Sequence, residues 1–235
     1  MLLDIKKIHC HYGALEALKG VSMKIDEGSI VALLGANGSG KSTTLKAISG
    51  LMKPTRGEIW FEGQRIDGIA AHKVVRHGIN HVPEGRGIFP LMTVFENLQM
   101  GAYCREDKEE IAEDLEKLCK RYPILAERKN QQASTLSGGE QAQLAIARGL
   151  MSRPKMLLLD EPLQGLAPLV VGDIEEMILE LNREGMTVLM VEHNIHMALG
   201  MSHKVYILGI GEVIMEGNPK ALSESEYVQK VYLAE

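Results

Sequence analysis

The stretch Gly35-Ala36-Asn37-Gly38-Ser39-Gly40-Lys41-Ser42 decides the fold of this chain of 235 residues. It fits the pattern G-x-x-x-x-G-K-[ST], and it stands in the required context, after an apolar strand and before a helix. The glycines of such a loop let backbone N–H groups converge on phosphate groups, and the positive end of the following helix adds to the attraction. A tight glycine turn without a ligand is the alternative, which the context disfavours. We therefore expect a nucleotide-phosphate site formed by Gly35, Asn37, Gly38, Ser39, Gly40, Lys41, Ser42 and Thr43.

The segments beside this loop predict its structural setting. Residues 30–34 are a continuous apolar run, as expected for a strand that is covered on both faces. A helix should follow from Lys41 to about Ser49, where Gly50 stops it. Upstream, residues 21–25 alternate apolar and polar side chains, which predicts a half-buried strand of an antiparallel layer.

The rest of the chain predicts an α/β fold with an insertion. Apolar runs at 156–159 and 186–191 are separated by a segment, 168–182, with apolar residues at helical spacing. This order of strand, helix and strand is typical of a parallel sheet. Residues from about 93 to 151 carry almost no strand signal and several helical stretches, so they predict an inserted helical subdomain.

Two carboxylates, Asp160 and Glu161, end the apolar run at 156–159. The ends of such strands are where open α/β sheets bind ligands. We expect Asp160 and Ser42 to hold magnesium, Lys41 to reach the terminal phosphates, and Glu161 to orient the attacking water. Taken alone, an acidic pair after a strand more often begins a solvated helix, but the phosphate loop upstream argues against that interpretation.

The segment Leu136-Ser137-Gly138-Gly139-Glu140-Gln141 is the third landmark. Ser137 and Glu140 form an S-x-x-E capping box, which predicts the start of a helix. A capped helix end with two glycines also presents free N–H groups to an anion, so both interpretations hold together.

These letters, LSGGEQ, resemble the signature of ATP-binding-cassette proteins, and the resemblance covers essentially the whole chain in the expected order. It implies a phosphate-loop ATPase fold of the cassette type over residues 1–235. Residues of about 1–92 and 152–235 would form a RecA-like core with an antiparallel β layer, and about 93–151 the helical subdomain. It also implies a head-to-tail sandwich of two cassettes, in which Ser137, Gly138, Gly139 and Glu140 contact an ATP that the opposite subunit holds.

Two further residues take roles from the same resemblance. Tyr12 is similar to the aromatic residue that stacks on adenine, although a single tyrosine after a strand is more often a packing residue. His193, which follows the strand expected at 187–192, is similar to the switch histidine that contacts the terminal phosphate. The implied catalytic residues are Glu161, His193 and Lys41, and the implied cofactors are ATP and Mg²⁺.

Two departures from the common pattern narrow the resemblance. Glu84, in the segment His81-Val82-Pro83-Glu84-Gly85-Arg86, stands where most cassettes have glutamine, and its carboxylate can still ligate magnesium. Ala167 stands where most have an aspartate that couples the two sites. Both segments resemble the ATPases of bacterial branched-chain amino acid importers. Leu163 and Gln164 fit that group poorly, and many of its members lack the histidine retained here as His193.

Composition and charge exclude other classes of protein. Hydrophobic residues make up 45% of the chain and charged residues 24%, which excludes a disordered or fibrous protein. The net charge of −5 gives no general attraction to nucleic acid, and we expect no such partner. Three cysteines at positions without a metal-binding pattern predict reduced thiols in the cytoplasm.

The sequence predicts that any membrane-spanning part belongs to another chain. The first ten residues lack the features of a signal peptide, and no apolar run approaches the roughly 20 residues of a membrane helix. We expect a cytoplasmic protein, peripheral on the inner face of the cell membrane.

The leading hypothesis is the motor of an importer for a small polar solute, such as a branched-chain amino acid. Its partners would be permease subunits in the membrane, a second cassette of the same or a related chain, and a solute-binding protein. The groove for the permease would include residues 89–103. A soluble cassette that acts as an assembly clamp, and the ATPase of a lipid or polysaccharide exporter, are the alternatives.

Overall fold

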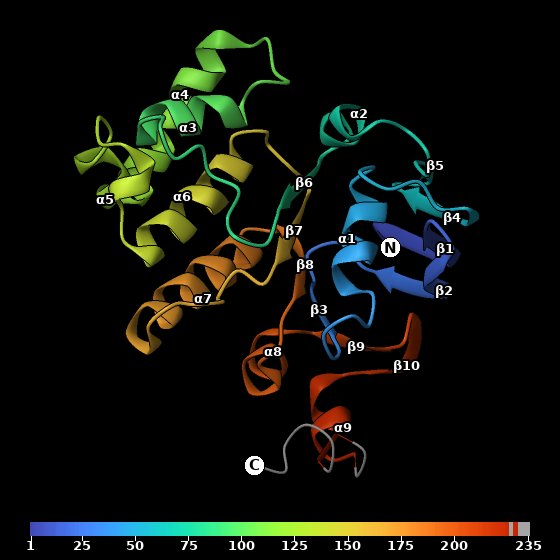
Figure 1. The fold of residues 1–235 in the computed structure, drawn as a ribbon. Helices are drawn as coiled ribbons and strands as arrows, with labels where there is room; N and C mark the ends of the chain where they lie inside the picture. Colours follow the sequence, from blue (N-terminus) through green and yellow to red (C-terminus); the bar gives the residue numbers. More distant parts are fainter. Residues whose placement is uncertain (226–227, 230–235) are drawn as a thin grey trace.

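The centre of the molecule is a six-stranded sheet in the order β10-β9-β3-β8-β7-β6 (Figure 1). Its strands are β3 (Ile30–Leu34), β6 (Ile79–Val82), β7 (Met156–Asp160), β8 (Thr187–Val191), β9 (Lys204–Gly209) and β10 (Glu212–Gly217). The first five are parallel, and β10 pairs with β9 in antiparallel fashion. The structure is a computed structural model that describes residues 1–225 and 228–229. Residues 226–227 and 230–235, which the expected core segment 152–235 includes, lie outside the described residues.

The register of this sheet places three functional loops at one edge. Leu33 lies opposite Val191, and Asp160 lies opposite Val191 from the other side. The carboxyl ends of β3, β7 and β8 therefore meet, and the loops that follow them leave from the same edge, as ligand-binding loops do in open α/β sheets.

A second, antiparallel sheet covers the six-stranded sheet on one side. Its order is β2-β1-β4-β5, with β1 (Leu3–Tyr12), β2 (Leu15–Ile25), β4 (Arg56–Phe61) and β5 (Gln64–Arg65). The predicted half-buried strand at 21–25 is the last part of β2, which begins earlier because Gly13 turns the chain directly from β1 into β2.

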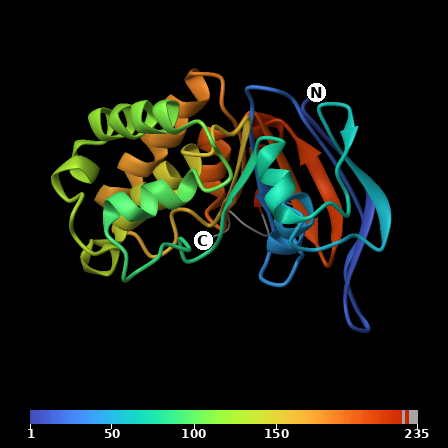
Figure 2. The ribbon, with the colours of Figure 1, turned by 90° about the horizontal axis from the view of Figure 1, so that it is seen from above.

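Alternating side chains of the six-stranded sheet build two separate cores. Val31 and Leu33 pack with the antiparallel sheet and with α1 (Lys41–Ile48), whereas Ile30, Ala32 and Leu34 pack with helices on the other face. A strand with apolar residues on both faces must be covered on both faces, which explains the unbroken apolar run. Figure 2 shows the resulting layers, with helices on one side of the sheet and α1 and the antiparallel strands on the other.

The helices between residues 94 and 183 group on the side of the molecule away from the antiparallel sheet (Figure 1). Four of them follow one another in the segment for which the sequence predicts a helical insertion: α3 (Val94–Gly101), α4 (Lys108–Arg121), α5 (Pro123–Glu127) and α6 (Gly138–Leu150), with the short 3₁₀ helix η1 (Ala133–Thr135) before α6. Among the described residues of this segment, the β pairing is a single isolated bridge between Thr93 and Gln132. α3 packs on α6, and α6 packs on β6 and α7 (Pro168–Arg183).

Shorter helices complete the fold: α2 (Ala71–Arg76), α8 (Ile195–Met201) and α9 (Pro219–Ser223). The predicted α/β fold with a parallel sheet, an antiparallel layer and a helical insertion is confirmed. Strands β1, β4, β5, β6, β9 and β10 were not among the predicted strands. Within residues 1–225 and 228–229, every helix is too short or too polar to cross a membrane.

Candidate active site

A pocket of about 460 Å³ opens at the sheet edge where β3, β7 and β8 end. It brings together side chains from five separate stretches of the sequence. Most of the residues predicted for the nucleotide are among those that line it: Tyr12, Asn37, Gly38, Gly40, Lys41, Ser42, Thr43, Glu84, Glu161 and His193. Leu15 and Ala17 of β2 and Gln164, which were not predicted, line it as well.

The loop before α1 needs glycine at the position that enters the helix. Gly40 has φ of 109°, and a Cβ there would lie 2.6 Å from Leu18 Cδ2. Any other residue would be strained and would collide with β2. Gly35 meets the same limit, because a Cβ there would overlap the carbonyl of Leu208 and lie 2.6 Å from Ser39 Oγ. The close approach of these segments therefore shapes the turn around the pocket.

The ammonium of Lys41 is held inside the loop. Its Nζ donates hydrogen bonds to Gly35 O at 2.8 Å and to Ala36 O at 3.1 Å. Burial lowers the pKa of Lys41, and the carboxylates of Glu161, Asp160 and Glu84 oppose that shift. Carbonyl oxygens are weaker partners for a cation than phosphate oxygens, so this geometry leaves the ammonium ready for an anion.

Three side chains with oxygen atoms that can ligate a metal ion, those of Ser42, Asp160 and Glu84, lie near the first turn of α1. Ser42 Oγ donates to Asp160 Oδ1 at 3.2 Å, which ties α1 to the end of β7. Burial raises the pKa of Asp160, and the nearby charges of Glu161 and Glu84 raise it further. Glu84 comes from the loop between β6 and α3 and lines the same pocket. Crowded carboxylates of this kind gain most from a bound cation.

The side chains of Glu161 and His193 contact each other at the sheet edge where β7 and β8 end. His193 Nε2 lies 2.5 Å from Glu161 Oε1, whereas Glu161 Oε2 is buried and has no hydrogen-bond partner among the described residues. Glu161 has φ of 53°, and its N–H donates to Val191 O at 3.0 Å. A left-handed backbone is costly for a residue with a Cβ, so the pairing with β8 holds this carboxylate in a strained conformation.

The four predicted signature residues do not line this pocket. Ser137 is the N-cap of α6, its Oγ accepts from Glu140 N at 3.4 Å, and Glu140 Oε2 accepts from Ser137 N at 2.7 Å. The predicted capping box is therefore present. Gly139 lies so close to α7 that a Cβ would overlap the side chain of Val170. The helix end is thus fixed by its own cap and by α7, away from Lys41.

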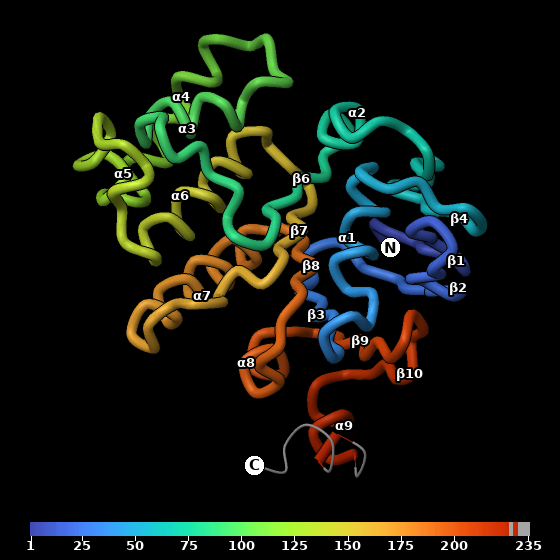
Figure 3. Tube along the Cα trace, viewed as in Figure 1, coloured from blue at the N-terminus to red at the C-terminus, as the bar shows by residue number. Residues whose placement is uncertain are grey.

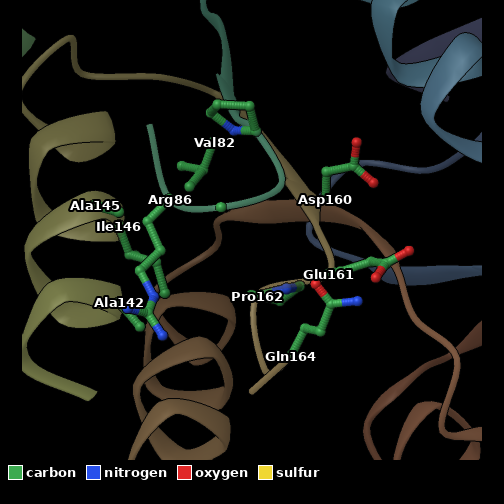
Figure 4. Close-up of a pocket in the computed structure, with 11 residues that line it drawn as sticks. Val82, Arg86, Ala142, Ala145, Ile146, Asp160, Glu161, Pro162 and Gln164 are labelled. Atoms are coloured by element: carbon green, nitrogen blue, oxygen red, sulfur yellow. The ribbon is translucent and has the colours of Figure 1, made fainter. Parts of the chain in front are cut away.

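A smaller cavity separates α6 from the sheet edge (Figure 4). Asp160 and Glu161 point away from α6 in this view, whereas Arg86 extends along the helix to Ala142. Arg86 Nη1 donates to Gln141 Oε1 at 2.6 Å, and Arg148 Nη1 donates to Gly87 O at 2.6 Å. These two arginines therefore hold the loop that carries Glu84 against α6. The chain trace in Figure 3 shows this loop passing from β6 to α3.

Sequence reasoning missed two polar residues close to Glu161. Glu192 is 5% exposed, and its carboxylate accepts from Leu163 N and His193 N, each at 3.3 Å. Burial, together with the charges of Glu161 and Glu175, raises the pKa of Glu192 to about 7. Gln164 lines both cavities. The sequence signal for a role of Glu192 was its position directly before His193. That signal is weak, because an acidic residue at a strand end is commonly solvated.

The combination of the pocket and the separate helix end defines the class of protein. A phosphate loop alone occurs in many nucleotide-binding folds, whereas a capped Ser-Gly-Gly-Glu helix on a helical insertion is typical of ATP-binding cassettes. A family model described as "ABC transporter" matches residues 18–164. The chain belongs to the ABC transporter family, as an ATP-binding and ATP-hydrolysing subunit.

Individual relatives are similar over nearly the whole chain. The high-affinity branched-chain amino acid transport ATP-binding protein BraG of Pseudomonas aeruginosa is 43% identical over 99% of both chains. The lipopolysaccharide export system ATP-binding protein LptB of Haemophilus influenzae is 34% identical over 100% of this chain and 98% of its own. The dimeric structure of an ATP-binding cassette bound to ADP and phosphate superposes with a TM-score of 0.82 at 29% identity, covering 93% of this chain and 99% of that one.

Proposed function

We propose that this chain powers the import of a small polar solute, a branched-chain or related amino acid, by binding and hydrolysing ATP on the cytoplasmic face of the cell membrane. The observation that carries the hydrolytic part is the convergence of Lys41, Ser42, Glu84, Glu161 and His193 on one pocket. The importer part is supported by the 43% identity to BraG.

Within this proposal, the phosphate loop positions ATP and Glu161 acts on the attacking water. Glu161 lines the pocket, and its carboxylate, whose Oε2 has no hydrogen-bond partner among the described residues, accepts a hydrogen bond from that water. His193, in contact with Oε1, fixes the orientation of the carboxylate and contacts the terminal phosphate. Lys41 exchanges its carbonyl partners for phosphate oxygens and stabilises the charge that develops there. Tyr12, which is 46% exposed beside the loop, stacks on the adenine.

Ser42, Asp160 and Glu84 are the residues that would hold Mg²⁺. All three offer oxygen atoms, which this cation prefers. Burial raises the pKa of Asp160, and the nearby charges of Glu161 and Glu84 raise it further. When bound, the ion would neutralise charge on the phosphate oxygens.

The proposal includes a second cassette, since Ser137, Gly138, Gly139 and Glu140 lie outside the pocket. In a head-to-tail pair, the first turn of α6 of each chain would face the phosphate held by the other chain. We also propose permease subunits, which receive force through residues 89–103, and a solute-binding protein. Phe89, Leu91 and Tyr103 in that segment are exposed large hydrophobic residues, which suits a protein contact.

Export of a lipid or polysaccharide is the second candidate, because of the 34% identity to LptB. The Val-Pro-Glu-Gly-Arg and Gly-Leu-Ala-Pro segments of the sequence favour the importer.

The deciding experiment uses the intact membrane complex. We expect the chain to co-purify with hydrophobic permease subunits, and vesicles that contain the complex and its binding protein to accumulate radiolabelled leucine when ATP is present at the cassette face. The same complex with Glu161→Gln serves as the control and should accumulate little. Co-purification with lipopolysaccharide-handling proteins, or leucine uptake that is independent of ATP, would overturn the importer assignment.

A further inference from the structure

The first turn of α6 carries a carboxylate close to the place where the proposed function requires a phosphate. Glu140 is the third residue of α6, and its side chain folds back to accept from Ser137 N at 2.7 Å. It therefore lies at the same helix end as the N–H groups of Gly138 and Gly139, which come too early in the helix to have an intrahelical acceptor. Burial raises the pKa of Glu140, but the hydrogen bonds from Ser137 and the charge of Arg128 lower it more, so the group is ionised at neutral pH.

An ionised Glu140 has two opposite effects at this helix end. It stabilises the first turn, because it completes the capping box and lies at the positive end of the helix. It also repels a second anion that approaches the same N–H groups, since like charges at short range in a partly buried site interact strongly. The cap is therefore compatible with phosphate binding only if another group balances its charge.

Arg128 is placed to provide that balance. It directly follows α5, and its Nε lies 2.8 Å from Glu140 Oε1. This Nε–H is not aligned as a hydrogen bond, so the contact acts through charge. Arg128 Nη1 donates to Gln131 Oε1 at 3.1 Å, and Gln131 Nε2 donates to Thr135 Oγ1 at 2.7 Å. The guanidinium is thus tied to the segment that leads into Ser137.

Arg86 is a second cation near this helix end, and its contacts are different. Its Nη1 donates to the neutral amide of Gln141 at 2.6 Å, and its Nη2 would lie 3.1 Å from a Cβ on Gly138. Its backbone belongs to the loop that carries Glu84. The ion pair recorded for Glu140 is the one with Arg128.

We propose that Arg128 is a positioning residue that offsets the charge of Glu140, so that the amino end of α6 can accept the terminal phosphate of a nucleotide held by a second cassette. The inference rests on the proposed function, because it assumes the head-to-tail pair. It predicts that Arg128 matters for the ATP-dependent meeting of two chains and not for the binding of ATP to one chain.

Dimer formation of the full chain tests this inference. In the Glu161→Gln background, light scattering would measure the ATP concentration that gives half-maximal dimer at low and at moderate salt. We expect Arg128→Gln to raise this concentration about 10-fold, with the larger effect at low salt. Arg128→Lys should stay within about 2-fold of the parent, because the charge is kept. Arg128→Gln with Glu140→Gln should also return to within about 2-fold, because both charges are then absent.

The control variant is Arg121→Gln. It removes the same charge from the helical segment and breaks ion pairs with Glu180 on α7 and with Glu184 directly after α7, away from the start of α6. We expect it to leave the ATP dependence of the dimer unchanged. Binding of a fluorescent ATP analogue to the single chain, and the thermal midpoint without nucleotide, should be similar for all of these variants.

The possible failures are distinguishable. The inference alone is overturned if Arg128→Gln dimerises like its parent, or if the double variant stays as impaired as Arg128→Gln, which would indicate a purely structural role. If the Glu161→Gln parent forms no dimer with ATP at all, both this inference and the proposed pairing of cassettes are wrong.

Discussion

The pocket around Lys41 and the amino end of α6 differ in how complete they are within one chain. At the pocket, residues from β1, the phosphate loop and the segments after β7 and β8 line one cavity, and the pairs Ser42 with Asp160 and His193 with Glu161 are already in contact. The amino end of α6 is equally well ordered by its capping box, but none of its residues is among the described residues that line the pocket. One region is an assembled site, and the other is a binding surface whose ligand must come from elsewhere.

This difference shows how a single chain can carry two unequal halves of a site. The loop between β6 and α3 joins them, because Glu84 lines the pocket while Arg86 contacts Gln141 of α6. The hydrogen bond from Arg86 therefore connects the loop that carries Glu84 directly to α6. Four experiments separate the contributions of the two regions.

Glu161→Gln should have the largest effect on ATP turnover, because it removes the carboxylate that acts on the attacking water and leaves the ATP-binding residues of the pocket intact. We expect ATP turnover to fall by about 10²-fold or more, while the affinity for ATP changes by only a few fold. A coupled assay for released phosphate and equilibrium binding of ATP measure the two quantities. Glu176→Gln is the control, since it removes an exposed carboxylate on α7 that pairs with Arg183. Turnover near the wild-type rate in Glu161→Gln would contradict the role of this residue.

Mixing two inactive variants should show that the halves belong to different chains. Lys41→Ala removes the ammonium that binds phosphate in the pocket. Ser137→Asp keeps a capping side chain, but its negative charge repels a phosphate at the start of α6. Each variant alone should lose about 10²-fold in turnover. Ser137→Asn caps without charge and is the matched control.

An equal mixture of Lys41→Ala and Ser137→Asp should recover roughly a quarter of wild-type turnover, if the chain pairs with its own copies. Half of the random pairs are mixed, and each mixed pair has one intact site of two. Phosphate release after incubation with ATP is the measurement. A mixture as inactive as its components would argue against sites shared between two copies.

Glu192→Gln should change how stability depends on pH. The pKa of Glu192 is about 7 in the folded chain against a usual 4.5, so the native state holds this proton more tightly than the unfolded state does. The wild type should therefore lose stability as the pH rises from about 5 to 8, and Glu192→Gln should lose on the order of 2 kcal/mol less over that window. Urea unfolding without nucleotide at both pH values measures this. Parallel curves for the two proteins would show that Glu192 is already ionised in the folded state.

Glu84→Gln should have the smallest effect on turnover, because the loop between β6 and α3 that joins the pocket to α6 stays in place. A glutamine carbonyl oxygen can still ligate a cation, and Arg86 and Arg148 hold the loop independently of residue 84. We expect turnover to change by less than about 3-fold, with a modest rise in the Mg²⁺ concentration required, and Glu84→Ala to cost more. A complete loss of turnover in Glu84→Gln would mean that the negative charge itself is essential.

Much of the fold and of the pocket could be predicted from the sequence because the signals are local. The apolar run of β3, the glycines of the loop and the S-x-x-E capping box each depend on residues within one turn or strand. Strands β6 and β9 could not be predicted in the same way, since their place in the sheet depends on parallel pairing with residues far away in the chain. Glu192 was missed for a related reason, because only packing against Leu163 turns a strand-end carboxylate into a buried one.

The sequence by itself determined the residues of the phosphate loop, the carboxylates after β7 and the cap of α6, since spacing alone brings the members of each set together. Only the tertiary structure decided which sets meet. The parallel register of β3, β7 and β8 places Lys41, Glu161 and His193 at one edge, whereas the helical segment keeps Ser137 outside that pocket. It also decided that Arg128 lies against Glu140, a contact between two charges twelve residues apart that no local pattern specifies.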